Sequence, residues 1–452
     1  MNLKISDYLA SSQPFIDNTS HETKRVIFAT RTGQIKEIKD SEWVLMNSGL
    51  INRLPEMLQT MLIEMEALVP EMEDELQLVL SRNNQAIAND QVLSIVIQPT
   101  AFCQLGCDYC GQSHSPQWLN KDLQEKILAR AERKLSSGRF KRFNISWFGS
   151  EPLSGINVMR VLSPKLIDLA KKYNCTYDSS IVTNGVAMLK EISLELIEIH
   201  KVISFNITLD GLPEYHDSRR NFKKSKKGTF EKIFSNVLSL VQVAPANIEI
   251  KIRTNVDSRN YEGVSPLIKY IADHGIQKKI KYYCVPVYSW SNDAHEKSLT
   301  PETFAELEMV WFIEMMKLGY TVGLIPKLKR IVCMAVTPQS EVIDSKGNIF
   351  NCTEISYVPL YEKTGMYRIG TLAGEETPQN RQALGNFNDD IANNTLPCST
   401  CNMLPVCGGG CPKSWYDGFE PCPSAKNNIN SRLMLHASMT RMQLEKDEIV
   451  VT

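Results

Sequence analysis

Three cysteines on one short segment carry the strongest chemical signal in this sequence. Cys103, Cys107 and Cys110 follow the pattern C-x3-C-x2-C in the segment AFCQLGCDYC. A cubane [4Fe-4S] cluster takes four cysteine ligands, so three thiolates leave one iron open to bind another group. A closed structural zinc site also needs four ligands. The spacing therefore favours an iron–sulfur cluster with one open iron, and zinc or a chance grouping of cysteines are the alternatives.

Two further motifs place polar residues where an apolar run ends. The segment WFGSEPL, residues 147–153, holds Gly149 beside Glu151. A glycine lets the backbone approach a ligand closely, and a carboxylate accepts hydrogen bonds from an ammonium group. The segment IVTNG, residues 181–185, holds Thr183 and Asn184, whose side chains can bind a ribose. Each motif alone is also typical of an ordinary turn.

These motifs lie in a region where strand-like and helix-like segments alternate. The strand-like segments are 92–97, 143–148, 178–183, 202–209, 247–254 and 279–286, and the helical patterns between them lie near 120–136, 160–173, 190–200, 228–242 and 262–274. Such alternation predicts an α/β fold with a parallel sheet and right-handed crossovers. Ligands then bind at the carboxyl ends of the strands. An open (β/α)6 barrel and a doubly wound sheet both fit the pattern.

The two flanks of this region have different patterns. The segments 25–30 and 34–38 read as strands of a hairpin around Thr32-Gly33, with helical patterns near 53–67 and 70–82. We interpret the acidic cluster at 71–75 as a solvated helix face, with an electrostatic guide for a basic peptide as the alternative. A helix is expected over 301–318 and another near 426–446. Loops and glycines are expected from 333 up to that last helix.

Composition excludes several classes of function. The chain has 452 residues with 50 basic and 51 acidic side chains, so a general role on nucleic acid or at a membrane surface gains no electrostatic support. No apolar run reaches the roughly 18 residues that would span a bilayer, and the start has no signal-peptide core. We therefore expect a cytoplasmic protein. Its twelve cysteines are better explained by metal binding than by disulfides.

Seven of these cysteines fall in the C-terminal third with ordered spacing. Cys333 is followed by thirteen residues, Gly347, four residues and Cys352. Further along come C-x2-C-x5-C-x3-C and one last cysteine, which are Cys398, Cys401, Cys407, Cys411 and Cys422. A chance arrangement of this order is very improbable, and a zinc ribbon is the alternative.

The cysteine loop and the strand-end motifs together resemble the radical S-adenosylmethionine (radical SAM) enzymes, and the C-terminal cysteines resemble the SPASM arrangement of that family. The resemblance covers about residues 90–430. It implies a partial (β/α)6 TIM-like barrel, an N-terminal α+β module and a C-terminal cysteine-rich SPASM domain. The expected bounds are 1–90 for the N-terminal module, 91–300 for the barrel, 301–332 for a linker helix, 333–430 for SPASM and 431–452 for a C-terminal helix.

The resemblance also implies which residues bind SAM. Tyr109 takes the place of the aromatic residue that lies by the adenine. The segment with Gly149 and Glu151 is similar to a Gly-Gly-Glu-Pro motif that binds the methionyl amino group, although Ser150 replaces the second glycine. Other implied contacts are Thr183 and Asn184 near the nucleoside, and Thr208, Arg220 and Arg253 near the carboxylate or ribose. Asp210 is expected to fix its loop or to pair with Arg220, and Asp210 and Glu354 are the only candidates for a base.

By the same resemblance, the SPASM cysteines hold two auxiliary [4Fe-4S] clusters, which gives three clusters in all. Cys333, Cys352 and Cys411 are assigned to the first, and Cys398, Cys401, Cys407 and Cys422 to the second. Seven cysteines cannot fill eight positions, so the first auxiliary cluster lacks one ligand. Cys284 and Cys175 are the other candidates, and both are expected as buried core residues.

The family relation points to a peptide substrate. We expect a maturase that forms a thioether, carbon–carbon or carbon–oxygen crosslink in a ribosomally made precursor peptide, with electrons from a flavodoxin or ferredoxin. Residues 1–90 would then bind a leader peptide, which would add as a strand to the edge of a sheet. The alternatives are a formylglycine-forming sulfatase maturase and a non-catalytic electron-transfer protein. In the sulfatase-maturing type an Asp follows the second SPASM cysteine, where this chain has Thr353 and then Glu354.

Overall fold

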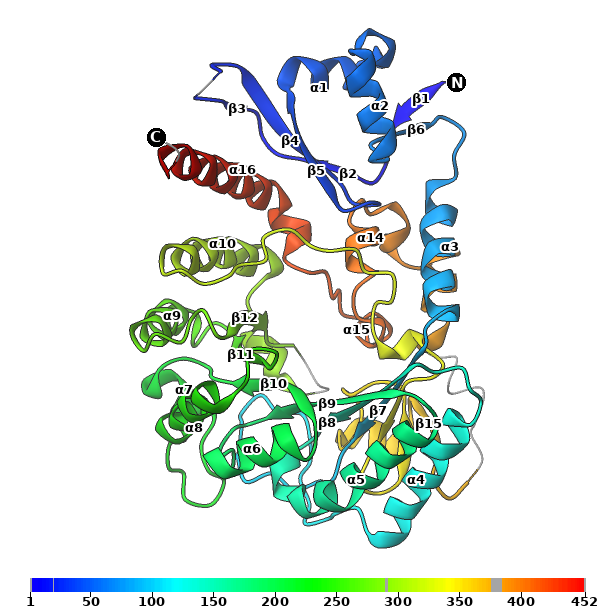
Figure 1. Cartoon of the computed structure of the whole chain (residues 1–452), viewed down its shortest axis with the longest axis vertical. Coiled ribbons are helices and arrows are strands. Elements are labelled where there is room, and N and C mark those ends of the chain that lie inside the picture. Colours follow the sequence, from blue (N-terminus) through cyan, green and yellow to red (C-terminus); the bar gives the residue numbers. More distant parts are fainter. Residues whose placement is uncertain (1, 19, 289–291, 375–383, 451–452) are drawn as a thin grey trace.

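A curved central sheet organises the molecule. The computed structural model describes residues 2–18, 20–288, 292–374 and 384–450, shown in Figure 1. Within these residues the sheet has nine strands in the order β12-β11-β10-β9-β8-β7-β13-β14-β15. Six of them are parallel and follow one another in chain order: β7 (Val92–Ile97), β8 (Arg142–Trp147), β9 (Thr176–Thr183), β10 (Val202–Thr208), β11 (Glu249–Val256) and β12 (Lys281–Pro286).

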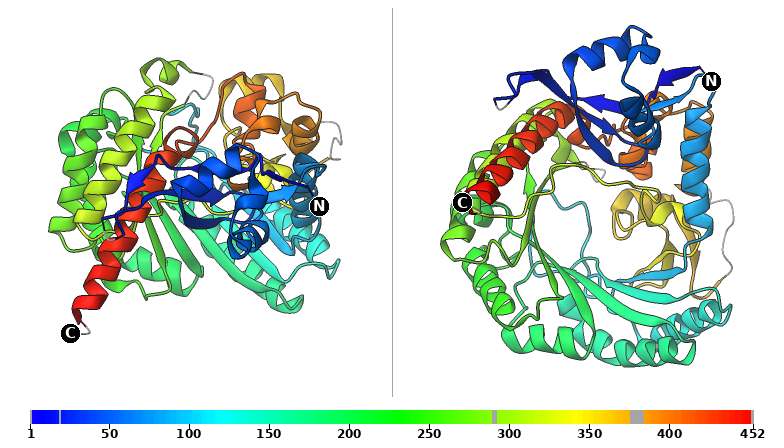
Figure 2. Two further views of the ribbon diagram at one scale, coloured as in Figure 1. Left: turned by 90° about the horizontal axis from the view of Figure 1, so that it is seen from above. Right: turned by 45° about the horizontal axis from the view of Figure 1, so that its top comes forward.

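Helices connect these strands and lie on the convex side of the sheet (Figure 2). They are α4 (Lys121–Leu135), α5 (Ile156–Lys172), α6 (Lys190–Glu198), α8 (Phe230–Val243) and α9 (Val264–Asp273). The predicted alternation is confirmed, with one added short helix, α7 (Pro213–Arg219). The sequential strand order has no reversal point and therefore rules out a doubly wound sheet. In the described part of the chain no pairing between β12 and β15 closes the sheet, which is consistent with an open TIM-like barrel.

Alternation along the strands builds the main core. In β7, Leu93, Ile95 and Ile97 are fully buried in the cluster that includes the helices of the convex side. Val96 points to the opposite face and packs with Val342 and other residues of the C-terminal region. Each fully buried aliphatic side chain contributes about 1.5–3 kcal/mol, so both faces of this strand favour the observed register.

The C-terminal region contains strands that the sequence did not predict. β13 (Glu341–Ile343) pairs in parallel with β7, and β14 (Asn348–Phe350) and β15 (Arg368–Thr371) continue the sheet in antiparallel fashion. These strands of three or four residues are too short to give a clear alternating pattern. The buried Glu341 fixes β13 to α4, because it accepts two hydrogen bonds of 2.7 Å from Arg130.

The N-terminal module contains the predicted hairpin. β4 (Thr23–Ala29) pairs with β5 (Gln34–Lys39), and Gly33 adopts the positive φ of 76° that the turn requires. β4 also pairs with β2 (Leu9–Ser11) and β3 (Phe15–Ile16), while β1 (Leu3–Ile5) pairs with β6 (Leu68–Pro70). The helices are α1 (Asp40–Asn47), which was not predicted, α2 (Glu56–Glu64) and α3 (Glu75–Ala88).

The acidic cluster at 71–75 is solvated only in part: Glu71 and Asp74 are exposed, but the interpretation was wrong for Glu73 and Glu75. Asp74 caps α3 by accepting from the backbone N–H of Gln77. Glu73 and the buried Glu75 form ion pairs of 2.6 and 2.9 Å with Arg31, which is itself buried. Two of the acids therefore neutralise an internal guanidinium.

The N-terminal module packs on the C-terminal part of the chain (Figure 2). α16 (Ala425–Val450) and α10 (Pro301–Lys317) confirm the two predicted helices, and α16 contacts α10, β2 and β4. Val26 and Phe28 of β4 share a core with Met403 and Leu433. In its described residues this region also holds α11 (Pro359–Thr364), α13 (Phe387–Ala392), α14 (Leu404–Cys407) and α15 (Pro412–Tyr416). Among the described residues, no helix combines the length and the apolar character needed to cross a bilayer.

Candidate functional site

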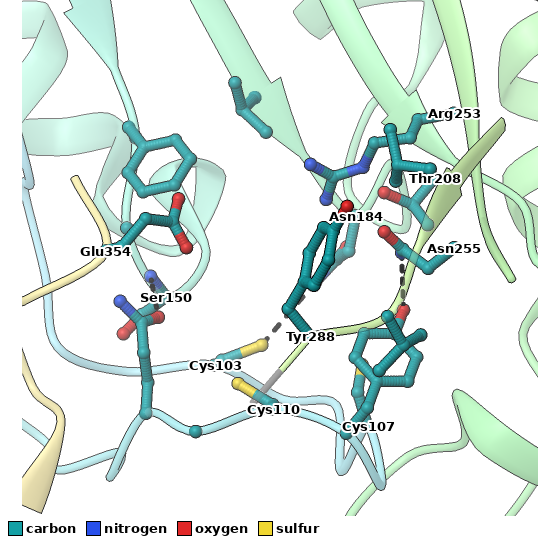
Figure 3. Close-up of a pocket in the computed structure, with 18 of the residues that line it drawn as sticks. Cys103, Cys107, Cys110, Ser150, Asn184, Thr208, Arg253, Asn255, Tyr288 and Glu354 are labelled. Atoms are coloured by element: carbon teal, nitrogen blue, oxygen red, sulfur yellow. Dashed lines mark hydrogen bonds between the residues drawn. The ribbon is translucent and has the colours of Figure 1, made fainter. Parts of the chain in front are cut away.

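A cavity of about 480 Å³ lies at the carboxyl ends of the parallel strands. The loop after β7 contributes Cys103, Cys107 and Cys110, and the C-terminal region contributes Glu354 and Cys411. In Figure 3 the three cysteines lie together, with Arg253 and Thr208 on one side of the space and Glu354 and Ser150 on the other. The sequence-predicted SAM contacts that line the cavity are Tyr109, Gly149, Thr183, Asn184, Thr208, Arg220 and Arg253.

The cysteine loop suits a multi-iron cluster. Cys103 is 7% exposed, and burial raises the pKa of its thiol to about 12 and that of Cys107 to about 11. A bound metal reverses this effect because it deprotonates a coordinating thiol. In the described part of the chain no three Cys, His, Asp or Glu side chains converge as ligands of a single ion. A cubane does not require that convergence, since each of its thiolates binds a different iron.

Tyr109 fastens this loop to the strand ends. Its hydroxyl donates to Asp210 at 2.6 Å and accepts from Arg220 at 2.5 Å and from the Asn255 amide at 2.9 Å. The Arg219 guanidinium lies 5.0 Å from the centre of the Tyr109 ring. The phenol therefore connects the loop between Cys107 and Cys110 to the residues that follow β10 and α7 and to β11.

Glu151 is placed beside the cavity rather than in its lining. It is 0% exposed, and its carboxylate accepts from the Thr183 hydroxyl at 2.7 Å and from the backbone N–H groups of Asn184 and Leu153 at 2.8 and 2.9 Å. Burial raises the pKa of this carboxyl, and the three donors act against that increase. Glu151 thus orders the end of β9, where Thr183 and Asn184 face the cavity.

The turn before Glu151 requires a residue without a side chain at position 149. Gly149 has a φ of 83°, and a Cβ at this position would meet the Gln98 side chain at 2.5 Å. Ser150 follows with a φ of 49°, the left-handed conformation that glycine adopts easily. The serine therefore keeps the backbone geometry of a glycine at some cost in strain.

The two candidate bases have different surroundings. Asp210 is fully buried and accepts from Tyr109 and from the backbone and side chain of Asn255. Burial acts to raise its pKa, but the charges of Arg220 and Arg219 outweigh this and lower it. Glu354 lines the cavity and receives one hydrogen bond of 3.3 Å from the neighbouring Thr353 hydroxyl. Of the two, only Glu354 can reach a molecule in the cavity.

Positively charged side chains line the cavity. Arg220 is 6% exposed and lies by the cysteine loop, and Arg253 and Asn255, two residues apart on β11, both line the cavity. The Nε atoms of both arginines are buried without a hydrogen-bond partner among the described residues. Lys413, which sequence reasoning missed, also lines the cavity and pairs with Asp417 at 2.7 Å. Its only sequence signal was its position two residues after Cys411.

The C-terminal cysteines gather in two further places. Cys398, Cys401, Cys407 and Cys422 line one small cavity together. Cys333 and Cys411 line a neighbouring cavity that Cys407 also borders. Cys352 lines neither cavity; burial and the charge of Glu354 raise the pKa of its thiol, and the charges of Cys411 and Cys333 add to that increase. The four cysteines expected in one set thus share a cavity, whereas of the other three only Cys333 and Cys411 do.

Neither Cys175 nor Cys284 lines any of these three cavities. Cys175 lies before β9, at the opposite end of that strand from Asn184, and bonds to the Phe140 carbonyl at 3.1 Å. Cys284 lies within β12 and packs against the main core. Cys175 is a buried residue of the core and Cys284 is half-buried against it, so neither lies with the assigned cluster cysteines around these cavities.

The sequence of this chain is similar to one family model and to several proteins. Residues 97–243 match the model of the Radical SAM superfamily. An uncharacterised protein of Synechocystis is 30% identical over 140 residues, which cover 29% of this chain and 34% of that protein. The serine-type anaerobic sulfatase-maturating enzyme of Bacteroides thetaiotaomicron is 22% identical over 371 residues, which cover 72% of this chain and 83% of that enzyme.

Solved structures show the same fold. Native anSMEcpe with bound AdoMet has a TM-score of 0.56 at 19% identity and covers 79% of this chain and 100% of its own. The same enzyme solved with AdoMet and the Cp18Cys peptide also has a TM-score of 0.56. SuiB of Streptococcus suis has a TM-score of 0.50 at 12% identity, with 93% of this chain and 98% of its own covered.

Proposed function

This chain contains a radical SAM domain, and from that premise we propose that it is a radical SAM/SPASM maturase of a ribosomally synthesised peptide. It would cleave SAM and form a thioether, carbon–carbon or carbon–oxygen crosslink between side chains. The observation that carries the proposal is the single cavity in which the cysteine loop faces Glu354 and Cys411 of the C-terminal region. A molecule in this cavity contacts the SAM-binding side and the auxiliary side together.

We assign the SAM side of the cavity to residues of the barrel. Cys103, Cys107 and Cys110 would hold a [4Fe-4S] cluster with one open iron. When bound, this cluster supplies the electron that cleaves SAM to a 5′-deoxyadenosyl radical, which abstracts a hydrogen atom from the substrate. Thr208, Arg220 and Arg253 would bind the SAM carboxylate, since a buried guanidinium favours an anionic partner. Tyr109, Gly149, Thr183 and Asn184 would position the nucleoside and the methionyl group, with Glu151 holding Thr183 and Asn184.

The auxiliary side would hold two more clusters. Cys398, Cys401, Cys407 and Cys422 offer four thiolates around one cavity, which suits a fully ligated cubane. Cys333, Cys352 and Cys411 offer three, and Cys411 also borders the main cavity. An open iron there would face the substrate, and the two clusters would take the surplus electron. A flavodoxin or ferredoxin would supply the electron that reduces the loop cluster.

A peptide is the substrate class that these features favour. The solved anSMEcpe structure that holds AdoMet together with a peptide supports a peptide partner for this fold. In the described residues β5 pairs with β4 alone, which leaves a strand edge where a leader peptide can add. Glu354 would serve as the base that takes a proton from the substrate side chain.

Formylglycine formation is the second candidate, and one observation favours it. The position after Cys352 is Thr353 rather than Asp, yet the next residue, Glu354, places a carboxylate in the cavity. The sulfatase-maturating relative from Bacteroides thetaiotaomicron covers most of both chains. Treatment of the modified peptide with a carbonyl reagent separates the two candidates, because formylglycine is an aldehyde and a crosslink is not.

Anaerobic reconstitution with iron, sulfide, dithionite and SAM tests the shared part of the proposal. We expect 5′-deoxyadenosine, measured by chromatography, and its absence from fully loaded protein would leave a non-catalytic electron-transfer role instead. Short peptides encoded beside the gene are then added, and mass spectrometry checks for loss of hydrogen from one of them. Abundant 5′-deoxyadenosine with no altered peptide would refute the assigned substrate while the SAM chemistry stands.

A further inference from the structure

The Tyr109 hydroxyl stands between a buried cation and a buried anion. It accepts a hydrogen bond from Arg220 Nη1 at 2.5 Å and donates one to Asp210 Oδ2 at 2.6 Å. Asn255 completes this group by donating to the hydroxyl at 2.9 Å and, through its backbone N–H, to Asp210 Oδ1 at 2.9 Å. The phenol thus separates two charges that would otherwise attract each other directly.

Arg220 has few other constraints on its guanidinium. It is 6% exposed, it lines the cavity with Cys107, and its Nε has no hydrogen-bond partner in the described residues. The residues on both sides of Arg220 are bonded to the cysteine loop, because the Gly106 N–H donates to the Asn221 carbonyl at 2.9 Å and the Asp108 N–H donates to the Arg219 carbonyl at 3.1 Å. The bond to Tyr109 is therefore the main contact that keeps this charge on the cysteine side, away from Asp210.

We propose that the Tyr109 hydroxyl is a positioning group that fixes the Arg220 guanidinium beside Cys107 and thereby sets the reduction potential of the cluster at Cys103, Cys107 and Cys110. This inference rests on the proposed function for the presence of the cluster. Reduction adds one electron, taken from the external reductant, to a cluster that is already anionic with its thiolates. A fixed positive charge in a buried, low-dielectric site stabilises the reduced form. Without the hydroxyl, Arg220 moves toward Asp210 and that stabilisation weakens.

The test is an anaerobic redox titration of the reconstituted full-length protein with dithionite, followed by EPR and without SAM or peptide. The signal of this cluster is the one missing from a variant in which all three loop cysteines are Ala. Arg220→Gln is expected to lower the equilibrium constant for reduction by about tenfold, and Tyr109→Phe by about threefold in the same direction.

A double-mutant cycle identifies the route of the effect. Because Tyr109 acts through Arg220, the double variant Tyr109→Phe with Arg220→Gln is expected to match Arg220→Gln alone. Tyr320→Phe is the matched control, since it removes another buried hydroxyl whose partner, the Ile268 carbonyl, is remote from the cluster loop. Its potential should equal that of the unmodified protein.

Two results would overturn the inference: a Tyr109→Phe potential equal to that of the unmodified protein, or additive shifts in the double variant. If Tyr109→Phe does not assemble the cluster, Asn255→Leu removes one of the three bonds to the hydroxyl without altering the loop. It should shift the potential the same way by a smaller amount, and an unchanged potential overturns the inference. Absence of the EPR signal from the unmodified protein would count against the proposed function, which separates the two failures.

Discussion

The carboxylate of Glu151 accepts a hydrogen bond of 2.7 Å from the hydroxyl of Thr183, and so links the segment after β8 to the end of the neighbouring strand β9. The same carboxylate accepts from the backbone N–H of Asn184 at 2.8 Å. Glu151 is therefore the group that orders the two polar residues of the β9 end, although it does not line the cavity itself.

Glu151→Gln should disturb this order. The amide has one acceptor oxygen and turns an NH2 group toward the donors of the site, so we expect a loss of about 2 kcal/mol in the free energy of unfolding. SAM affinity should fall about tenfold, because Thr183 and Asn184 lose their support. Denaturant unfolding and calorimetric SAM titration measure the two effects, with the partly exposed Glu195→Gln on α6 as control. Unchanged SAM affinity would contradict the assigned role.

Iron counting tests the three cysteine sets. Fully reconstituted protein should hold about twelve irons per chain, four in each of three cubanes. Replacing Cys398 and Cys401 by Ala should remove about four irons and leave 5′-deoxyadenosine formation measurable. Cys107→Ala should abolish SAM cleavage while the C-terminal clusters stay in place. An unmodified protein with only about four irons would remove the auxiliary clusters from the proposal.

Glu354→Gln should separate SAM cleavage from substrate modification. The residue lines the cavity opposite the SAM-binding side, so 5′-deoxyadenosine should still form while peptide modification falls by about 100-fold or more. Glu362→Gln, which removes a carboxylate paired with Lys346 outside the cavity, is the control. Equal loss of 5′-deoxyadenosine and of modified peptide would show that Glu354 serves SAM binding instead.

Ser150→Gly should stabilise the fold. Ser150 has a φ of 49°, and the left-handed conformation costs a residue with a Cβ about 1–2 kcal/mol. Glycine removes that strain but gains freedom in the unfolded chain, so the net increase in unfolding free energy should be at most about 1 kcal/mol. Ser154→Gly, four residues on at an ordinary φ, should destabilise. A loss of stability in Ser150→Gly would mean that the serine side chain has a role of its own.

His216 should make stability fall on acidification. Its Nδ1 accepts from the Asp210 N–H at 3.1 Å, so its proton lies on Nε2, which donates to Thr229 at 3.1 Å. Burial and the charge of Arg220 lower its pKa from 6.5 to about 3. The unfolded chain binds a proton at 6.5 and the folded chain only near 3, so this stability is complete above 6.5 and is lost as the pH falls toward 3.

The expected slope from His216 is about 1.4 kcal/mol for each pH unit below its unfolded pKa. Anaerobic urea unfolding at about pH 7.5 and about pH 5.5 measures it. His216→Gln should be less stable at the higher pH and should lose less on acidification. The same slope in both proteins would show that other groups control the acid sensitivity.

Sequence patterns predicted which chemical groups the site contains better than they predicted which residues contact one another. Cys103, Cys107 and Cys110, close together in the sequence, line one cavity, and Cys398, Cys401, Cys407 and Cys422 line another. The third set is less compact, since Cys411 borders the first cavity too and Cys352 lines none of the three cavities. Glu151 and Asp210 were harder to place, because a residue type shows that a carboxylate is present but not which donors surround it. β13 was missed because its register depends on pairing with β7, which lies far away in the sequence.

The sequence by itself determined the alternation of strands and helices and the spacing of the cysteines. Both are local properties, since the hydrophobic periodicity and the cysteine spacing depend only on the order of residues along the chain. The tertiary structure alone decided that Glu354 and Cys411 face the cysteine loop, and that Tyr109 meets Asp210, Arg220 and Asn255. These contacts join residues up to hundreds of positions apart, and they exist only because the parallel sheet brings its strand ends to one edge and β13 docks the C-terminal region beside it.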